Sequence, residues 1–488
     1  MSRSFTPTAE QDAIVDAVIH GRNLKIKAFA GAGKTSTLRL VASRLADKRG
    51  SYLAFNREIA EHARRGFPPN VVSRTMHSVA YASVGSALRS RLDLPAEQPH
   101  ELAARYQLGA LELPGIMGKA LEITPFDIGR MIVDGLGRFC RSAQVSPEAF
   151  HVPVDEKIDE AAGQWLREAL LPYVTRLWEE SIAPRAHQAI GPDVVLKVWA
   201  LTDPRLDADF ILFDEAQDSD GVMLSVLGRQ RHAQIIYVGD PYQQIYEWRG
   251  AINAMASIDA PELALSESFR FGPTFATLAS RLLGLLGERT PIRGQHAIGS
   301  IMVEDPSIAP PVDAILCRKN ATAIWHLAAG VEMGHKPAIR MSSAEIEAFA
   351  DGADQLIAGR RAFRPAAFSL FENWGEVQSF ARSAVGRDLL PIVRIVEECG
   401  TGYIRALARR ATPEPVADYV ISTVHRAKGL EWKRVKVVND FRFGVVDGRL
   451  SVDDEEMRLL YVAITRAQHV LDISELREEL LRLFHKRT

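Results

Sequence analysis

The sequence predicts an α/β protein built on parallel sheets. Short apolar and β-branched runs recur along the chain, each ends in a polar turn, and helical periodicity follows it. Strands that are apolar along their whole length are typical of parallel sheets covered by helices on both faces. At 488 residues the chain exceeds the length at which a single hydrophobic core stops growing. We therefore expect at least two domains.

Seven apolar runs predict the strands of these sheets. They lie at residues 24–28, 52–55, 210–213, 235–238, 314–317, 420–424 and 435–438. Two segments interrupt the strands with mostly helical patterns. The first, 85–205, contains "ELAARYQLGALEL" and "GQWLREALLPYVTRLWEE", and the second is 343–411. We expect both segments to be helical insertions.

The composition, 47% hydrophobic and 25% charged, is typical of soluble globular proteins. No apolar run approaches the roughly 18 residues of a membrane span, and the N-terminus lacks a signal-peptide core, so we expect a cytoplasmic protein without a membrane partner. Cys140, Cys317 and Cys399 are widely spaced and form no C-x-x-C, so we expect buried apolar residues. With a net charge of −2, a polyanionic partner has to bind in a local groove.

The stretch "AFAGAGKTSTL" at 28–38 predicts a phosphate-binding loop between a strand and a helix. Ala28 stands where the usual G-x-x-x-x-G-K-[ST] pattern has its first glycine, but at a strand end we expect a methyl group to be tolerated. Backbone N–H groups can wrap the phosphates, Lys34 can neutralise them, and the Thr35 hydroxyl can bind Mg²⁺. A glycine-rich turn that merely opens a helix is the alternative. The predicted phosphate-binding residues are Gly31, Ala32, Gly33, Lys34, Thr35 and Ser36.

A second motif, "FILFDEAQD", places two acidic residues after an apolar strand. In a chain with a phosphate-binding loop, Asp214 is suited to hold the metal and Glu215 to position the attacking water. The alternative is a solvated strand end.

Two arginines are candidates for stabilising the charge that develops during phosphoryl transfer, Arg270 in "SESFRFGP" and Arg466 in "LLYVAITRAQ". Taken singly, each could also be a surface or capping arginine. Before Arg466, apolar residues recur at i, i+3, i+4 and i+7, which predicts a helix with a buried stripe. The stripe consists of Met457, Leu460, Tyr461 and Ile464.

In order and spacing these motifs resemble those of the UvrD/Rep/PcrA group of superfamily 1 DNA helicases. The segments "AFNREIAEHA" and "GDPYQQIYEWRGA" are most similar to its F-box DNA helicase branch, and the resemblance runs from Phe5 to about Val470. Because the motor motifs begin almost at the first residue, we expect no F-box.

The resemblance implies two RecA-like P-loop NTPase domains with an ATP site in the cleft between them. The first is expected from 1–84 and 206–268 around insertion 85–205. The second is expected from 269–342 and 412–488 around the short insertion 343–411.

For the nucleotide, ATP with Mg²⁺, the resemblance implies that Gln11 reads the adenine and that Phe269 stacks on it. Glu431 in "HRAKGLEW" contacts the ribose or couples to it, and Gln243 in "GDPYQQ" senses the γ-phosphate. The roles of Lys34, Thr35, Asp214 and Glu215 follow the chemistry above, with Arg270 and Arg466 supplied from the opposite domain.

For the DNA strand, the resemblance implies a set of contact residues in several motifs. They are Phe55, Asn56, His77 in "TMHSVA", Tyr246, Trp248, Arg249 and His425. A translocase that grips any base sequence needs aromatic platforms and backbone contacts, and the segment "QQIYEWRG" supplies them directly after Gln243. An aromatic pair packed in the core is the alternative for this segment.

The function implied is an ATP-dependent helicase that moves 3′ to 5′ on single-stranded DNA and engages single-strand/duplex junctions, in DNA repair or recombination. Three alternatives stay open. The chain could strip proteins such as recombinase filaments from DNA, serve as the motor or sensor subunit of a larger nuclease or defence complex, or move on RNA.

Overall fold

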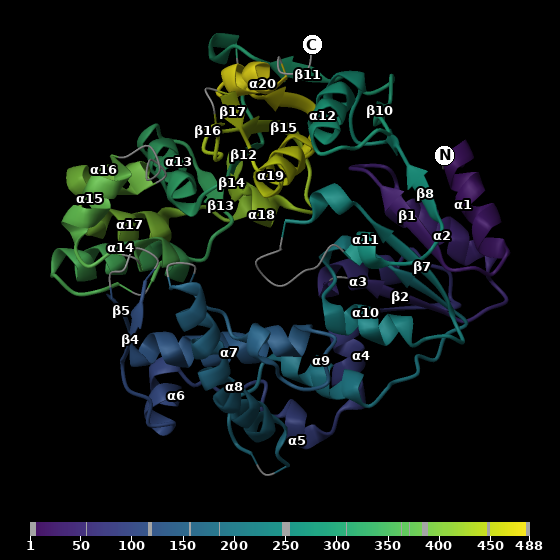
Figure 1. Cartoon of the computed structure of the whole chain (residues 1–488). Coiled ribbons are helices and arrows are strands. Elements are labelled where there is room, and N and C mark those ends of the chain that lie inside the picture. The colour runs from purple at the N-terminus through teal and green to yellow at the C-terminus, as the bar shows by residue number, and fades with distance from the viewer. Residues whose placement is uncertain are drawn as a thin grey trace. The chain divides into compact units, whose positions relative to one another are not determined.

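The computed structural model describes residues 6–484 except 55, 116–119, 156–157, 185, 246–253, 309, 363, 370, 383–388 and 447–448. The chain divides into two compact units. The first comprises Met1–Ala28 and Lys34–Leu265, and the second comprises Phe29–Gly33 and Ser266–Thr488. Each unit contains a sheet with helices packed on it (Figure 1).

The first unit is built on a sheet whose six described strands are all parallel, in the order β3-β2-β6-β7-β1-β8. Every residue of the central strands β6 and β7 is buried, as expected for strands covered on both faces. The α/β class with parallel sheets is therefore confirmed. The strands are β1 (Leu24–Ala28), β2 (Gly50–Ala54), β3 (Val71–Thr75), β6 (Phe210–Phe213), β7 (Gln234–Gly239) and β8 (Glu262–Leu265).

Some helices of the first unit follow strand ends and begin at polar caps. Thr75 caps α4 by accepting from the Ser78 amide, and Asp220 caps α10 by accepting from the Met223 amide at 3.0 Å. One apolar core joins β6 and β7 to α4, α7, α9 and α10. The helices are α1 (Ala9–Ile19), α2 (Lys34–Arg44), α3 (Arg57–Arg64), α4 (Met76–Ser83), α7 (Pro125–Arg141), α9 (Pro192–Leu201), α10 (Gly221–Gly228) and α11 (Ala254–Ser257).

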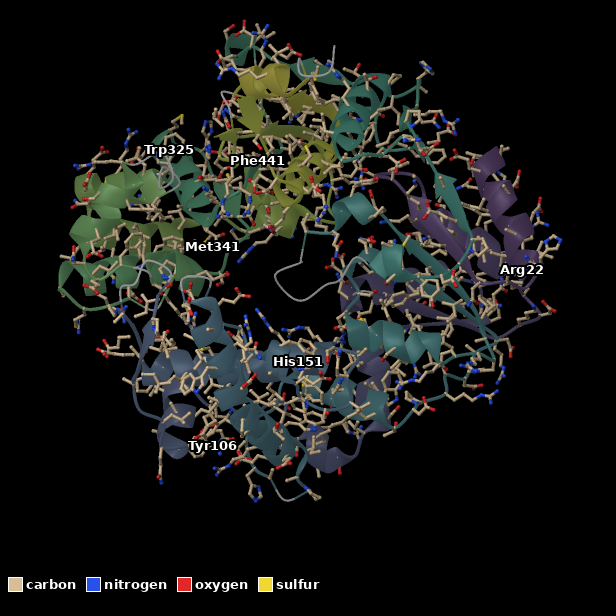
Figure 2. All side chains as sticks on the ribbon, viewed as in Figure 1. Arg22, Tyr106, His151, Trp325, Met341 and Phe441 are labelled. Atoms are coloured by element: carbon tan, nitrogen blue, oxygen red, sulfur yellow. The ribbon has the colours of Figure 1, made fainter. Side chains whose placement is uncertain are left out.

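The first insertion has an apolar core of its own, formed mainly by α6, α7 and α8 with β4 and β5. Tyr106 (labelled in Figure 2) has the guanidinium carbons of Arg105 and Arg176 at 4.7 and 4.5 Å from its ring centre, and its hydroxyl donates to Glu180. Besides α7, the insertion contains α5 (Ser86–Arg89), α6 (Pro99–Arg105), β4 (Leu111–Pro114), β5 (Ala120–Ile123) and α8 (Glu160–Ile182).

The helix expected across "ELAARYQLGALEL" is wrong in its second half. Helix α6 ends at Arg105, Gln107 takes a left-handed conformation with φ of 56°, and the chain then forms the antiparallel pair β4 and β5. In β4 the burial alternates, with Glu112 exposed and Leu113 buried. An alternation with period two belongs to a strand with one covered face, which the helix-like composition concealed.

The second unit contains a sheet of six described parallel strands in the order β11-β18-β15-β12-β14-β13. These strands are β11 (Ile301–Val303), β12 (Ala314–Cys317), β13 (Pro337–Ile339), β14 (Tyr419–Thr423), β15 (Trp432–Val437) and β18 (Ala467–Asp472). Two further pairs are β9 (Glu267–Ser268) with β10 (Arg293–Gly294), and β16 (Gly444–Val446) with β17 (Arg449–Ser451).

The second insertion shares its core with this sheet. Residues of β12, α13 and β14 form one apolar cluster with α14, α15, α16 and α17, which gather beside α13 in Figure 1. The helices of the unit are α12 (Pro273–Leu285), α13 (Asn320–Glu332), α14 (Ser343–Ile357), α15 (Trp374–Ala381), α16 (Leu390–Cys399), α17 (Thr401–Arg410), α18 (Val424–Ala427), α19 (Asp454–Ile464) and α20 (Arg477–Phe484).

Two smaller expectations are corrected. Cys140 and Cys317 are buried as expected, but Cys399, the last residue of α16, is exposed. Val424, expected in a strand, begins α18. Within the described ranges, no helix combines the length and the apolar character that crossing a membrane requires.

Candidate functional site

Most of the predicted site residues of the first unit lie where strands of its sheet end. Because the strands are parallel, their carboxyl ends share one edge of the sheet. Strand β1 leads into the phosphate loop, β6 into Asp214, and β7 into Asp240, whereas β2 and β3 lead toward Asn56 and His77. The strand order therefore places the predicted DNA-binding residues on one side of Asp214, at the ends of β2 and β3. The phosphate loop follows β1, on the other side of Asp214.

Two glycines give the loop its shape. Gly31 and Gly33 have φ of 72° and 75°, which favours glycine, and a Cβ on Gly31 would lie 2.5 Å from the Ser268 Oγ. Ala28 is the buried last residue of β1, so this position needs no glycine. Lys34, Thr35 and the following Ser36 form the first turn of α2, whose N–H groups have no partner within the helix and favour an anion.

Lys34 faces the carboxylates at the end of β6. Its Nζ donates to both oxygens of Glu215, at 2.8 and 2.9 Å, and both side chains are at least four-fifths buried. Burial alone lowers the pKa of Lys34, but the charges of Glu215 and Asp214 outweigh it and raise the pKa above its usual value. The lysine is thus held as a cation where phosphate is expected.

Asp214 is buried and bonded on both oxygens. It accepts from the Tyr52 hydroxyl at 2.6 Å and from the Glu215 amide at 2.9 Å. Burial and the neighbouring charge of Glu215 raise its pKa, while Lys34 and Tyr52 act in the opposite direction.

Glu215 has a left-handed backbone, with φ of 53°. For a residue other than glycine this conformation costs about 1–3 kcal/mol and is found where function demands it. The surrounding bonds compensate the strain and aim the carboxylate at Lys34. A strained residue at this point supports the role predicted for Glu215.

Two residues that sequence analysis did not assign connect this pair to the predicted phosphate sensor. Gln217 donates to Glu215 at 2.6 Å and accepts from the Asp240 amide at 3.0 Å. Asp240 in turn accepts from Gln243 Nε2 at 2.7 Å. A Cβ on Gly239 would lie 2.4 Å from Gln217 Oε1, so glycine makes room for the bridge. The strings "DEAQD" and "GDPYQQ" contain both residues, but only the fold shows that they meet.

The residues present fit a divalent cation. Asp214 and Glu215 bring two carboxylates together at a largely buried position, and the charge of Lys34 partly offsets them. Carboxylate and hydroxyl oxygens are the ligands that Mg²⁺ prefers. The carboxylate of Asp214 and the hydroxyl of Thr35 are the groups that would hold it.

Gln11, expected to read the adenine, is buried inside the first unit. Its side-chain oxygen accepts from the Thr8 amide and its nitrogen donates to Thr37 Oγ1, both at 3.0 Å. An adenine contact therefore requires these bonds to be exchanged, and the role remains a prediction.

The second unit brings several predicted nucleotide residues together. Arg270 donates to Glu431 at 2.5 Å and to the Thr465 carbonyl at 2.9 Å, and Gln468 donates to Glu431 at 2.8 Å. Phe269 is 43% exposed, as a stacking platform needs to be, and its amide donates to the Gly31 carbonyl within the same unit.

Arg466 is almost fully buried after α19. Its guanidinium donates to the carbonyls of Val462 and Leu430 and to Thr465 Oγ1, at 2.9–3.2 Å. The predicted stripe of Met457, Leu460, Tyr461 and Ile464 is buried as well, and other faces of α19 are also covered. These bonds hold Arg466 in one orientation.

The predicted DNA-binding residues are described only in part. Asn56 caps α3 by accepting from the Ile59 amide, His77 lies in the first turn of α4, and the half-buried His425 lies in α18. The other four, Phe55, Tyr246, Trp248 and Arg249, lie outside the described residues.

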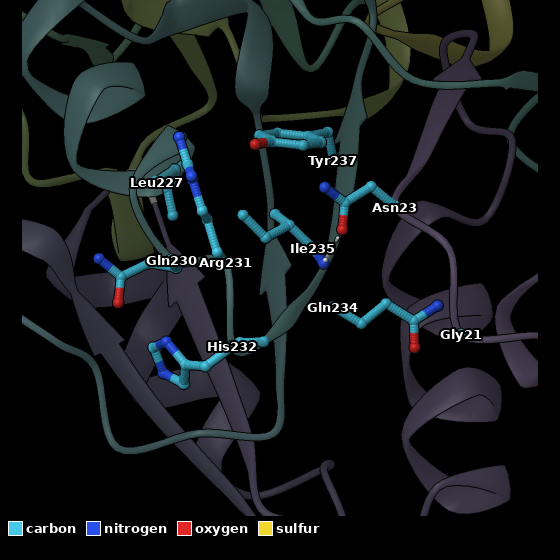
Figure 3. A pocket seen from close by; sticks show the side chains of 11 residues that line it. Gly21, Asn23, Leu227, Gln230, Arg231, His232, Gln234, Ile235 and Tyr237 are labelled. Carbon is cyan, nitrogen blue, oxygen red and sulfur yellow. Dashed lines mark hydrogen bonds between the residues drawn. The ribbon is translucent and has the colours of Figure 1, made fainter.

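A polar cavity of about 290 Å³ lies at the opposite edge of the same sheet (Figure 3). Its lining includes Asn23 before β1 and Gln234 and Ile235 at the start of β7. The amino ends of the strands form this edge, so the cavity is separate from the predicted nucleotide residues.

Comparison with known proteins identifies two helicase domains. The profile of the UvrD/REP helicase N-terminal domain matches residues 168–259, and that of the UvrD-like helicase C-terminal domain matches 411–478. F-box DNA helicase protein 1 of Schizosaccharomyces pombe is 31% identical over 96% of this chain and 57% of its own length. F-box DNA helicase 1 of Gallus gallus is 29% identical over 98% of this chain and 50% of its own. The chain thus spans about half the length of these relatives.

A third relative matches a shorter segment. The ATP-dependent DNA helicase UvrD2 of Mycobacterium bovis is 38% identical over 88 residues, which cover 15% of this chain.

Replacing Gln217 tests the bridge between Glu215 and Asp240. In Gln217→Ala the amide contacts to Glu215 and Asp240 are lost, and we expect ATP turnover to fall about 10- to 100-fold, as for other groups that orient a catalytic residue. Steady-state phosphate release measures the effect. Gln230→Ala, which removes another buried glutamine of the first unit that bonds to Pro204 and Leu206, is the matched control. Equal turnover in Gln217→Ala and the parent protein would show that the bridge has no catalytic role.

Proposed function

We propose that this chain, a member of the UvrD-like helicase family, is an ATP-driven motor that moves 3′ to 5′ along single-stranded DNA. One observation carries the proposal. A single edge of the first-unit sheet holds Lys34, Asp214 and Glu215 together with His77 and Asn56. Groups suited to a triphosphate and to a nucleic-acid strand therefore share one rigid element.

The nucleotide chemistry follows from the contacts of Glu215. Gln217 holds one carboxylate oxygen, so the side chain is oriented to accept a proton from a water that attacks the γ-phosphate. Lys34 stabilises the phosphate charge. Mg²⁺ held by Thr35 and Asp214 would neutralise phosphate oxygens and the developing charge.

The bond chain from Glu215 through Gln217 and Asp240 to Gln243 supplies the coupling. A change at Gln243 when the γ-phosphate leaves shifts Asp240 and, through Gln217, the catalytic carboxylate. The segment that follows Gln243 is the one predicted to hold the strand. ATP hydrolysis is in this way connected to a change in how the DNA strand is bound.

Arg270 and Arg466 are proposed to stabilise the transition state from the second unit. The carbonyls that hold Arg466 fix its guanidinium before reaction, which lowers the reorganisation cost of placing a positive charge. Arg270 is bonded to Glu431, the predicted ribose contact, so nucleotide recognition and charge stabilisation share one ion pair.

DNA is the polymer that the names of the relatives specify, and we extend it to this chain as single-stranded DNA and junctions in repair or recombination. The 3′-to-5′ direction rests on the motif resemblance.

Removal of the Lys34 amine tests the nucleotide site. Lys34→Ala should lower ATP turnover by about 10²–10³-fold, because a preorganised charge at the phosphate is lost. Circular dichroism checks that the fold is kept. Lys27→Ala, a lysine of β1 that pairs with Glu262, should keep normal turnover. Normal turnover in Lys34→Ala would remove the phosphate-loop assignment.

Duplexes with one overhang test the direction of movement. We expect ATP-dependent strand separation from a 3′ single-stranded overhang and none from a 5′ overhang, measured with fluorescently labelled strands. RNA overhangs of equal length should give less stimulation of ATP turnover than DNA. Separation from the 5′ overhang alone would contradict the proposed direction, and ATP turnover indifferent to either polymer would contradict the motor itself.

A further inference from the structure

Charged side chains from four helices meet at one place in the first unit. His77 lies in the first turn of α4, Arg141 ends α7, Asp193 lies in the first turn of α9, and Asp220 caps α10. These helices belong to one core, and α9 contacts the other three. Of the four side chains, the function proposed above uses only His77.

Asp193 is the centre of this cluster. Its Oδ1 lies 3.2 Å from His77 Nε2, and its Oδ2 accepts from the Arg141 guanidinium at 2.8 Å. Burial raises the pKa of Asp193, but the hydrogen bonds from His77 and Arg141 outweigh it and lower the pKa below its usual value. The carboxylate is therefore ionised at neutral pH and uses both oxygens.

The helix that carries Asp193 is firmly held. One turn later, the buried Lys197 donates to the carbonyls of Ser142 and Gln144, at 2.8 and 2.5 Å, just after the end of α7. The start of α10 also packs closely against the segment that follows α7, because a Cβ on Gly221 would lie 3.0 Å from the Ala143 amide. Asp193 thus presents its carboxylate from a rigid frame.

The contact with Asp193 orients the His77 ring, with Nε2 toward the carboxylate. Nε2 donates to the carboxylate, and in the imidazolium form of the ring Nδ1 also carries a proton, which it can donate to a phosphate oxygen. About a third of the His77 side chain is exposed. The N-terminus of α4 favours an anion in the same place. These features match a phosphate of a DNA backbone.

Charge around His77 also suits a phosphate. A lone carboxylate beside the ring would repel an anion, but Arg141 neutralises Asp193 directly. Asp220 is another nearby acid, and burial together with Asp193 raises its pKa to about 6, although the bond from the Met223 amide, His77 and Arg141 act in the opposite direction. Its carboxylate is turned to the Met223 amide of its own helix.

We propose that Asp193 is a positioning residue for DNA binding, which fixes the His77 imidazole so that the ring contacts a backbone phosphate. The proposal rests on the proposed function, in which His77 contacts the strand. Arg141 supplies the positive charge that offsets the Asp193 carboxylate, so that this carboxylate can lie near a bound phosphate.

The test is a double-mutant cycle on binding of a fluorescein-labelled oligothymidine, measured by anisotropy. We expect His77→Ala and Asp193→Ala each to weaken binding about three- to tenfold, and the double variant to bind no worse than His77→Ala alone. A purely structural role for Asp193 predicts that its effect persists in the His77→Ala background.

Asp127→Ala is the matched control. Asp127 also lies in the first turn of a helix of the first unit and pairs with an arginine, Arg130, at 3.5 Å, but it does not bond to His77. The Asp127→Ala variant should bind the oligonucleotide with the affinity of the parent protein. Thermal unfolding of all variants checks the fold, and Asp193→Asn, which keeps the volume of the side chain, replaces Asp193→Ala if that variant unfolds.

The outcomes separate the two proposals. If the parent protein does not bind the oligonucleotide, the proposed function and this inference both fail. If it binds, but His77→Ala has no effect or the two substitutions are additive, the positioning role of Asp193 is overturned and the motor remains.

Discussion

The ion pair between Lys34 and Glu215 is the interaction on which the proposed nucleotide site depends. Asp214 and Glu215 are consecutive, largely buried acids, and without a cation their mutual repulsion and desolvation would oppose ionisation. Lys34 supplies that cation and gains its own high pKa from them. Because the same amine is suited to phosphate, we expect phosphate binding to rearrange the pair that stabilises the proposed site before binding.

The parallel sheet connects this ion pair to the predicted DNA-binding residues. Its strand order sets Asp214 between the phosphate loop and the residues near β2 and β3. The bonds of Gln217 extend from the carboxylates toward β7, and the helices that follow β3 and β6 meet again around Asp193. In the proposed motor, nucleotide and DNA therefore act at neighbouring strand ends along one edge of the same sheet.

Local patterns predicted much of this arrangement. The strand before the loop, the strand before Asp214 and the helix before Arg466 were all recognisable, because a continuous apolar run or a helical period leaves a direct trace in sequence. The left-handed conformation of Glu215 was not predictable, since it depends on bonds to distant residues. Gln217 and Asp193 were missed for the same reason. Each acts only through a partner far away in the chain.

The most direct test of the account is reciprocal linkage between the two ligands. Binding of a labelled single-stranded DNA is measured with and without a non-hydrolysable ATP analogue, and analogue binding is measured with and without the DNA. If one sheet couples both sites, the two affinities change by the same factor, several-fold or more. An affinity for DNA that is unchanged by the analogue, in a protein that binds both, would contradict the account.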